Sequence, residues 1–135
     1  MTAVGRRANS KANEVSALEV VNTFFDAIEA RDFERAEAQL SAERFSYEGP
    51  IERHDNAAAF IRSISRIGSI LESLRRRRMF VDGDEVCAIL TYETTLEAIE
   101  SVRIAHWIRL ERGQITRMES FFDARAYTGM FDPEP

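Results

Sequence analysis

Residues that form disulfides or bind metals are scarce in this chain of 135 residues, which has one cysteine, Cys87, and two histidines, His54 and His106. A single cysteine cannot form a disulfide within the chain, and we therefore expect a reducing compartment, the cytoplasm. Two histidines and one cysteine are also too few for an ordinary structural zinc site, which is built mainly from those two residue types. Only a site rich in carboxylates stays open, and we expect no metal and no cofactor.

Long apolar segments and an excess of basic charge are also absent. No uninterrupted apolar run approaches the roughly 20 residues that cross a bilayer, so we expect no membrane-spanning segment. Residues 1–14 are polar and lack the apolar core of a secretory signal. Asp and Glu outnumber Lys and Arg by 23 to 18, which gives a formal net charge of −5. This acidic balance argues against general nucleic-acid binding, which usually needs a basic surface.

What remains is the composition of one folded domain. Hydrophobic residues make up 44% of the chain and include nine phenylalanines, enough to fill the core of a fold of this length. Residues 1–13 show no hydrophobic period, and we predict a flexible N-terminal tail there. Residues 14–135 are predicted to form a single domain.

Apolar residues at helical spacing predict three helices in the first half of the chain. A capping-box pattern at Ser16 predicts the start of the first helix. Asp32 is the predicted N-cap of a short second helix that ends near Leu40, and Asp55 is that of the third. The stripe of the first helix consists of Leu18, Val21, Phe25 and Ile28.

The second half of the chain shows the alternation and turn residues of strands. Residues 79–81 and 86–91 flank a turn at 82–84, and residues 102–110 and 114–122 flank a turn at 111–113. A linking strand is expected at 92–96 and an early short strand at 44–47. Helices followed by strands with short turns predict an α+β fold, with about three helices on one face of a curved antiparallel sheet.

Five short motifs occur in a characteristic order along residues 17–131. They are residues 21–27, 31–33, 47–50, 105–115 and 121–123. Each is weak alone, but their order and spacing resemble the nuclear transport factor 2-like superfamily, and its SnoaL-like branch in particular.

The resemblance implies a cone in which the helices pack on the concave face of the sheet and enclose an apolar pocket. It also implies a homodimer formed through the outer face of the sheet. The superfamily includes ketosteroid isomerases, polyketide cyclases, limonene-epoxide hydrolases, scytalone dehydratases and non-enzymatic transport or assembly modules. Because one fold carries so many activities, whether this protein is an enzyme depends on its site.

Asp123 is the main candidate for chemistry, since the resemblance places it where epoxide hydrolases and SnoaL-like cyclases have a functional aspartate. An apolar pocket would raise its pKa by desolvation and suit it to general acid or base catalysis. Alternatively, Asp123 ends its strand and caps the following turn. Strand alternation leaves open which face carries it.

Tyr47 resembles the tyrosine that helps to hold the attacking water in epoxide hydrolases. Alternatively, it is a half-buried aromatic residue on a short strand. Gly49 stands where those hydrolases have an asparagine and where ketosteroid isomerases have their base. Phe24 and Ala105 stand where the isomerases have hydrogen-bond donors. We therefore expect neither steroid-type isomerisation nor epoxide hydrolysis by the mechanism of those hydrolases.

The resemblance also implies which residues line the pocket. These are Phe24, Ala105 and Trp107, with Met118 as a further lining residue. Periodicity alone favours the opposite face of residues 102–110, which is the more apolar one. Both faces can be buried if one encloses the pocket and the other meets a second subunit. On that reasoning His106 is placed on the interface side, as a structural imidazole.

Three other features have ordinary structural interpretations. His54 is expected in a solvated loop, and Cys87 is expected to be a small core residue. The run Arg75–Arg78 is expected to be a solvated segment between helix and strand, with its side chains split between two faces.

The sequence therefore predicts a small-molecule-binding protein with an enclosed apolar pocket. Acid–base catalysis of the cyclase, isomerase, dehydratase or hydrolase type would use Asp123 and Tyr47. The alternative is a non-catalytic ligand-binding or dimerisation module, and the small subunit of a ring-hydroxylating oxygenase is a third hypothesis. The expected partners are a small apolar molecule and a second copy of the chain, with no nucleic acid and no membrane.

Overall fold

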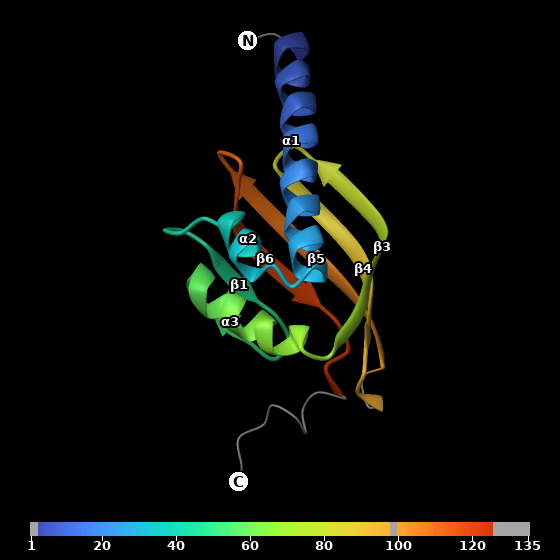
Figure 1. Ribbon diagram of the computed structural model, residues 1–135. Helices are drawn as coiled ribbons and strands as arrows, with labels where there is room; N and C mark the ends of the chain where they lie inside the picture. The colour runs from blue at the N-terminus through green and yellow to red at the C-terminus, as the bar shows by residue number, and fades with distance from the viewer. Residues whose placement is uncertain (1–2, 98–99, 126–135) are drawn as a thin grey trace.

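A computed structural model describes residues 3–97 and 100–125, in which three helices lie against one face of a curved, six-stranded sheet (Figure 1). The helices are α1 (Ala3–Glu29), α2 (Phe33–Ala38) and α3 (Ala57–Gly68). The strands are β1 (Ser46–Glu48), β2 (Arg53–His54), β3 (Leu71–Asp82), β4 (Glu85–Thr94), β5 (Ser101–Glu111) and β6 (Gln114–Phe121). The predicted α+β fold with three helices is confirmed. None of these helices combines the length and apolar character needed to span a membrane.

The sheet has the strand order β2-β1-β6-β5-β4-β3 and is mixed. Strands β3 to β6 form an antiparallel meander, as predicted. The expectation of a wholly antiparallel sheet is wrong at β1, which pairs parallel with β6. The reason is that the whole meander separates β1 from β6 along the chain, so no short hairpin turn joins the two strands and makes them antiparallel. The expected separate strand at 92–96 is also absent from the described residues, because β4 continues to Thr94.

The helix starts were predicted with different success. Asp32 is the N-cap of α2, where its side chain accepts a hydrogen bond from the Arg35 N–H. The N-cap of α3 is Asn56 rather than Asp55, since Asn56 has the extended backbone and accepts from the Ala59 N–H at 2.8 Å. Helix α1 begins at Ala3, so Ser16 lies inside the helix and is not its first residue as predicted.

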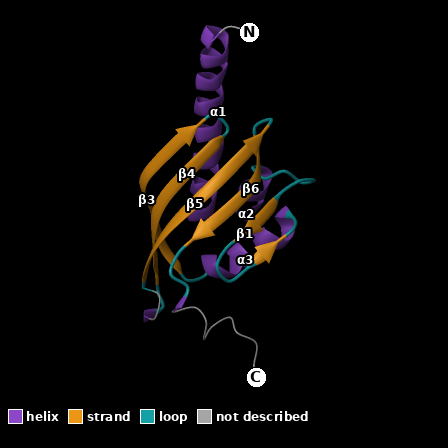
Figure 2. Ribbon diagram, turned by 180° about the vertical axis from the view of Figure 1, so that it is seen from behind, coloured by secondary structure: helices purple, strands orange, loops and turns teal. Residues whose placement is uncertain are grey.

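The core lies between the helices and the concave face of the sheet. It includes Val21, Phe25, Leu90, Ile108 and Met118, all of which are buried. The convex face of the sheet is not covered by helices, as the view from behind shows (Figure 2). Each long strand therefore has one face against the core and one face outside.

The arginine run lies inside β3, not between helix and strand as expected. A bulge between Arg76 and Arg78 leaves Arg77 without a partner on β4 and turns its two neighbours to opposite faces. Arg76 points to α1, where its guanidinium donates to Asn22 Oδ1 at 2.9 Å and pairs with Asp26. These contacts tie the edge strand β3 to the first helix.

We predict that Arg76→Met lowers the free energy of unfolding by about 1–2 kcal/mol, because charge-assisted hydrogen bonds between β3 and α1 are lost. The measurement is urea unfolding followed by circular dichroism. Arg77→Met is the matched control, since Arg77 is exposed at the bulge, and it should change stability by less than about 0.5 kcal/mol. Equal effects of the two substitutions would contradict the prediction.

Candidate functional site

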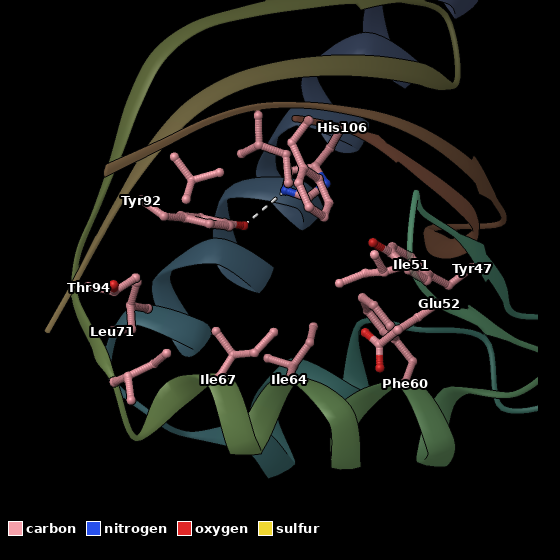
Figure 3. A pocket seen from close by; sticks show the side chains of 14 residues that line it. Tyr47, Ile51, Glu52, Phe60, Ile64, Ile67, Leu71, Tyr92, Thr94 and His106 are labelled. Atoms are coloured by element: carbon pink, nitrogen blue, oxygen red, sulfur yellow. Dashed lines mark hydrogen bonds between the residues drawn. The ribbon is translucent and has the colours of Figure 1, made fainter. Parts of the chain in front are cut away.

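A cavity of about 100 Å³ lies between α3 and the concave face of the sheet (Figure 3). Most of its walls are aliphatic or aromatic side chains. Five lining residues carry polar groups, namely Tyr47, Glu52, Tyr92, Thr94 and His106. The other lining residues are Ile51, Phe60, Ile64, Ile67, Ile70, Leu71, Val102, Ile104 and Phe122. This is the mixture typical of a small-molecule site, with an apolar wall and a few polar groups that orient the ligand.

A row of hydrogen-bonded side chains crosses one wall of the cavity. His106 on β5 lies at its centre, with its Nε2 atom 2.9 Å from the Tyr92 hydroxyl on β4. The Nδ1 atom of His106 lies 2.6 Å from Ser120 Oγ on β6. Ser120 in turn acts on the phenol of Tyr47 on β1, whose pKa it lowers. Four neighbouring strands thus contribute one side chain each to a continuous polar row.

The imidazole of His106 is neutral. Complete burial lowers its pKa from the ordinary 6.5 to about 3, because the charged form would lose its hydration. A neutral imidazole has one N–H donor and one acceptor nitrogen. The direction in which the hydrogen bonds of the row run is therefore set by which nitrogen carries the proton.

Tyr47 enters the cavity from the opposite side to Tyr92 (Figure 3). Burial raises the pKa of its phenol, the hydrogen bond from Ser120 lowers it, and the negative charge of Glu52 raises it again, with burial the largest cause. The Tyr47 ring stacks on Phe60, with 4.4 Å between centroids. A Cβ at Gly49 would lie only 2.5 Å from the Tyr47 hydroxyl oxygen, so a side chain at that position would displace the phenol.

Glu52 is the carboxylate of the cavity lining. Its Oε1 atom accepts a hydrogen bond of 2.5 Å from the Ser63 hydroxyl of α3. The Nε2 atom of His54 lies 3.5 Å from the same oxygen and has no hydrogen-bond partner among the described residues. Since Ser63 fixes the carboxylate against α3, Glu52 links the loop between β1 and β2 to the helix that closes the cavity.

Comparison with known proteins identifies the family. Residues 21–118 match the family model of the SnoaL-like domain. The chain belongs to the SnoaL-like domain family. No curated protein matches this SnoaL-like domain.

Solved structures with this fold have diverse descriptions. An NTF2-like protein of unknown function from Cytophaga hutchinsonii has a TM-score of 0.73 at 21% identity, covering 82% of this chain and 93% of its own. An LEH-like epoxide hydrolase from M. tuberculosis has a TM-score of 0.72 at 18% identity, with coverages of 87% and 90%. A proposed ketosteroid isomerase from Kribbella flavida has a TM-score of 0.70 at 18% identity, with coverages of 91% and 85%. At these identities the likeness shows the fold alone.

In this SnoaL-like domain His106 lies on the concave face of the sheet, whereas we expected it on the outer face. Its side chain is buried there, and its ring centroid lies 5.7 Å from that of Phe25 on α1. The periodicity of residues 102–110 was the correct guide, because alternate residues of β5 are buried under the helices. Ala105 and Trp107 therefore lie on the convex face and not in the cavity lining. Trp107 is 41% exposed, and its indole N–H donates to Glu85.

The other predicted residues of the site are also dispersed. Phe24 and Met118 are on the concave side, but they are buried in the core and do not line the cavity. Asp123 lies beyond the end of β6, where Arg125 donates to it from its backbone N–H and its guanidinium. These hydrogen bonds lower the pKa of Asp123 to about 2, and the carboxylate is not part of the cavity lining. Of the predicted site residues, Tyr47 lines the cavity. Asp123 lies outside the cavity lining, and a chemical role for it stays a prediction.

Polar side chains of the cavity lining that sequence reasoning missed include Tyr92 and Glu52. Tyr92 falls in the alternation of β4 with buried Ala88 and Leu90, so that a full reading of this strand could have placed it on the concave face. Glu52 lies in an irregular segment between two very short strands, where no hydrophobic period indicates the direction of a side chain.

We predict that the free energy of unfolding falls as pH drops below about 6.5, by about 1.4 kcal/mol per pH unit from His106 alone. The unfolded chain binds a proton on this histidine near pH 6.5, whereas the folded chain resists it down to about pH 3. The contribution of His106 to the free energy of unfolding is therefore fully present above the pKa of the unfolded chain, near 6.5. It is lost as the pH falls from there to the folded pKa of about 3. Urea unfolding at a series of pH values measures this slope.

His106→Gln should lose this share of the slope, whatever its effect on stability at neutral pH. His54→Gln is the matched control that removes the other histidine, and it should keep the share due to His106. A slope that is unchanged in His106→Gln would contradict a buried, neutral imidazole.

Proposed function

We propose that this SnoaL-like domain binds a small, mostly apolar molecule with one polar group in the cavity under α3. The observation that carries the proposal is the cavity itself, whose aliphatic and aromatic walls are interrupted by the Tyr92–His106 pair on one side and by Tyr47 and Glu52 on the other. Burial of apolar surface supplies the affinity, at roughly 25 cal/mol per Å². The polar groups supply orientation, because a ligand oxygen or nitrogen left without a partner there would lose its hydrogen bonds to water.

Acid–base catalysis in the same cavity is the second candidate function, of the cyclase, isomerase, dehydratase or hydrolase type. The observation that favours it is the closeness of Tyr47 and Glu52, which place a phenol and a carboxylate beside one space. The names of an epoxide hydrolase and a proposed isomerase among the structures with this fold support the same idea. A non-catalytic ligand-binding module would use the same groups for orientation only.

We predict that toluene or cyclohexanol binds the wild-type domain and that Ile67→Phe weakens this binding at least about tenfold, because a larger side chain occupies the cavity. Isothermal titration calorimetry measures the affinities. Val15→Phe, an exposed position on α1, and Asp123→Asn should both leave the affinities unchanged. Absence of binding to the wild-type domain, or equal binding by Ile67→Phe, would refute the proposed function.

We also propose that the domain forms a homodimer through the convex face of the sheet. Large apolar side chains are exposed there, with Phe80 at 49%, Trp107 at 41% and Phe121 at 56%. Phe80 and Trp107 flank Cys87 on neighbouring strands, in register. Exposed aromatic side chains gathered on one face are typical of protein interfaces. A second copy presents the same face, and a two-fold axis would bring the two patches together.

We predict that Trp107→Glu converts the protein from dimer to monomer, since it places two charges in the apolar centre of the interface. Multi-angle light scattering after size-exclusion chromatography measures the mass. Val15→Glu, at an exposed position of α1, is the matched control and should stay dimeric. A wild-type protein that elutes as a monomer would contradict the proposal.

The site of action that we propose is the cytoplasm. The support is the single cysteine, which is typical of proteins from reducing compartments.

A further inference from the structure

The charge of the cavity lining, as far as the structure describes it, comes from one residue. Glu52 is the only Asp, Glu, Lys or Arg among the described residues that line the cavity. His106, on the same lining, is neutral because its pKa is lowered to about 3. Within the described part of the lining, Glu52 is therefore the single charged group, and His54, which is outside the lining, lies 3.5 Å from its Oε1 atom.

The carboxylate of Glu52 has acceptor capacity left. Ser63 donates to Oε1, whereas Oε2 receives no hydrogen bond from the described residues. The Nε2 atom of His54 approaches Oε1 at 3.5 Å, which is ion-pair distance, but it forms no hydrogen bond with a described residue. A carboxylate can accept several hydrogen bonds, so a donor from the ligand has a place to bind.

The position of Glu52 suits a charged ligand group. Its side chain is 23% exposed, so that water still reaches part of the carboxylate. An ammonium group bound there would keep part of its hydration, and the large cost of burying an unpaired charge would be avoided. In Figure 3 the apolar side chains Ile64 and Ile67 lie along the floor of the cavity between Glu52 and Leu71, where the hydrocarbon part of the ligand would pack.

We infer that the ligand is a small amine with an apolar skeleton, whose protonated amino group donates to Glu52. This inference rests on the proposed function and names the chemical class of its ligand. A ligand carboxylate would be repelled by Glu52 and would find no Lys or Arg among the described lining residues. A neutral alcohol of the same shape would bury the same apolar surface but would form a weaker hydrogen bond than an ammonium group forms with a carboxylate.

The experiment compares three molecules with one skeleton, namely cyclohexylamine, cyclohexanol and cyclohexanecarboxylate, by isothermal titration calorimetry at neutral pH. We expect the amine to bind the wild-type protein at least about tenfold more tightly than the alcohol, since hydrogen bonds to charged groups are the stronger ones. The carboxylate should bind most weakly.

Glu52→Gln should bring the amine and the alcohol to similar affinities, because the amide keeps the shape and can still accept from Ser63. Glu48→Gln is the matched control. Glu48 is 46% exposed and pairs with Arg117 outside the cavity lining, so this variant should keep the preference for the amine. Circular dichroism establishes that both variants are folded, and the comparison of amine with alcohol in the wild-type protein needs no variant at all.

The outcomes separate the two proposals. If the alcohol binds the wild-type protein as tightly as the amine, or if Glu52→Gln keeps the preference for the amine, the inference is wrong and the proposed binding function stands. If none of the three molecules binds, the proposed function fails, and the inference fails with it.

Discussion

The structure depends on one constraint, which is that the deeply buried imidazole of His106 needs a hydrogen-bond partner at each of its two nitrogens. His106 meets this requirement with Tyr92 on one neighbouring strand and Ser120 on the other. Ser120 extends the row to Tyr47 on β1. The row thus links polar side chains on four adjacent strands. Three polar side chains of the cavity lining, those of Tyr47, Tyr92 and His106, belong to this row.

The helices complete the cavity from the other side. Ser63 of α3 binds Glu52, and Phe60 of α3 stacks on Tyr47, so the same helix holds both groups on that side of the cavity. At the far end of α3, the Arg31 guanidinium donates to the backbone oxygens of Gly68 and Leu71. The covering helix is therefore tied down at both ends, and the space beneath it has a defined shape. A defined space of this kind is what selective binding of a small molecule requires.

Much of the fold could be predicted because its signals are local. The Asp32 cap and the turn at 82–84 follow from residues that lie next to one another in the chain. Glycine at position 83 has a positive φ of 60°, as a tight hairpin turn of this type requires. The parallel pairing of β1 with β6 could not be predicted. The paired residues Tyr47 and Met118 lie far apart in the sequence, and no local pattern encodes their pairing.

The sequence by itself determined which residues of β5 share a face, because strand alternation is a property of the backbone and His106 follows the period of its apolar neighbours. It also determined the resemblance to the SnoaL-like branch, through the order of its motifs. Only the tertiary structure decided which of the two faces of β5 is concave, since that depends on where the helices pack. It also decided that Glu52 lines the cavity while Asp123 pairs with Arg125 outside it. A carboxylate in a loop has no periodicity, and its neighbours come from distant parts of the chain.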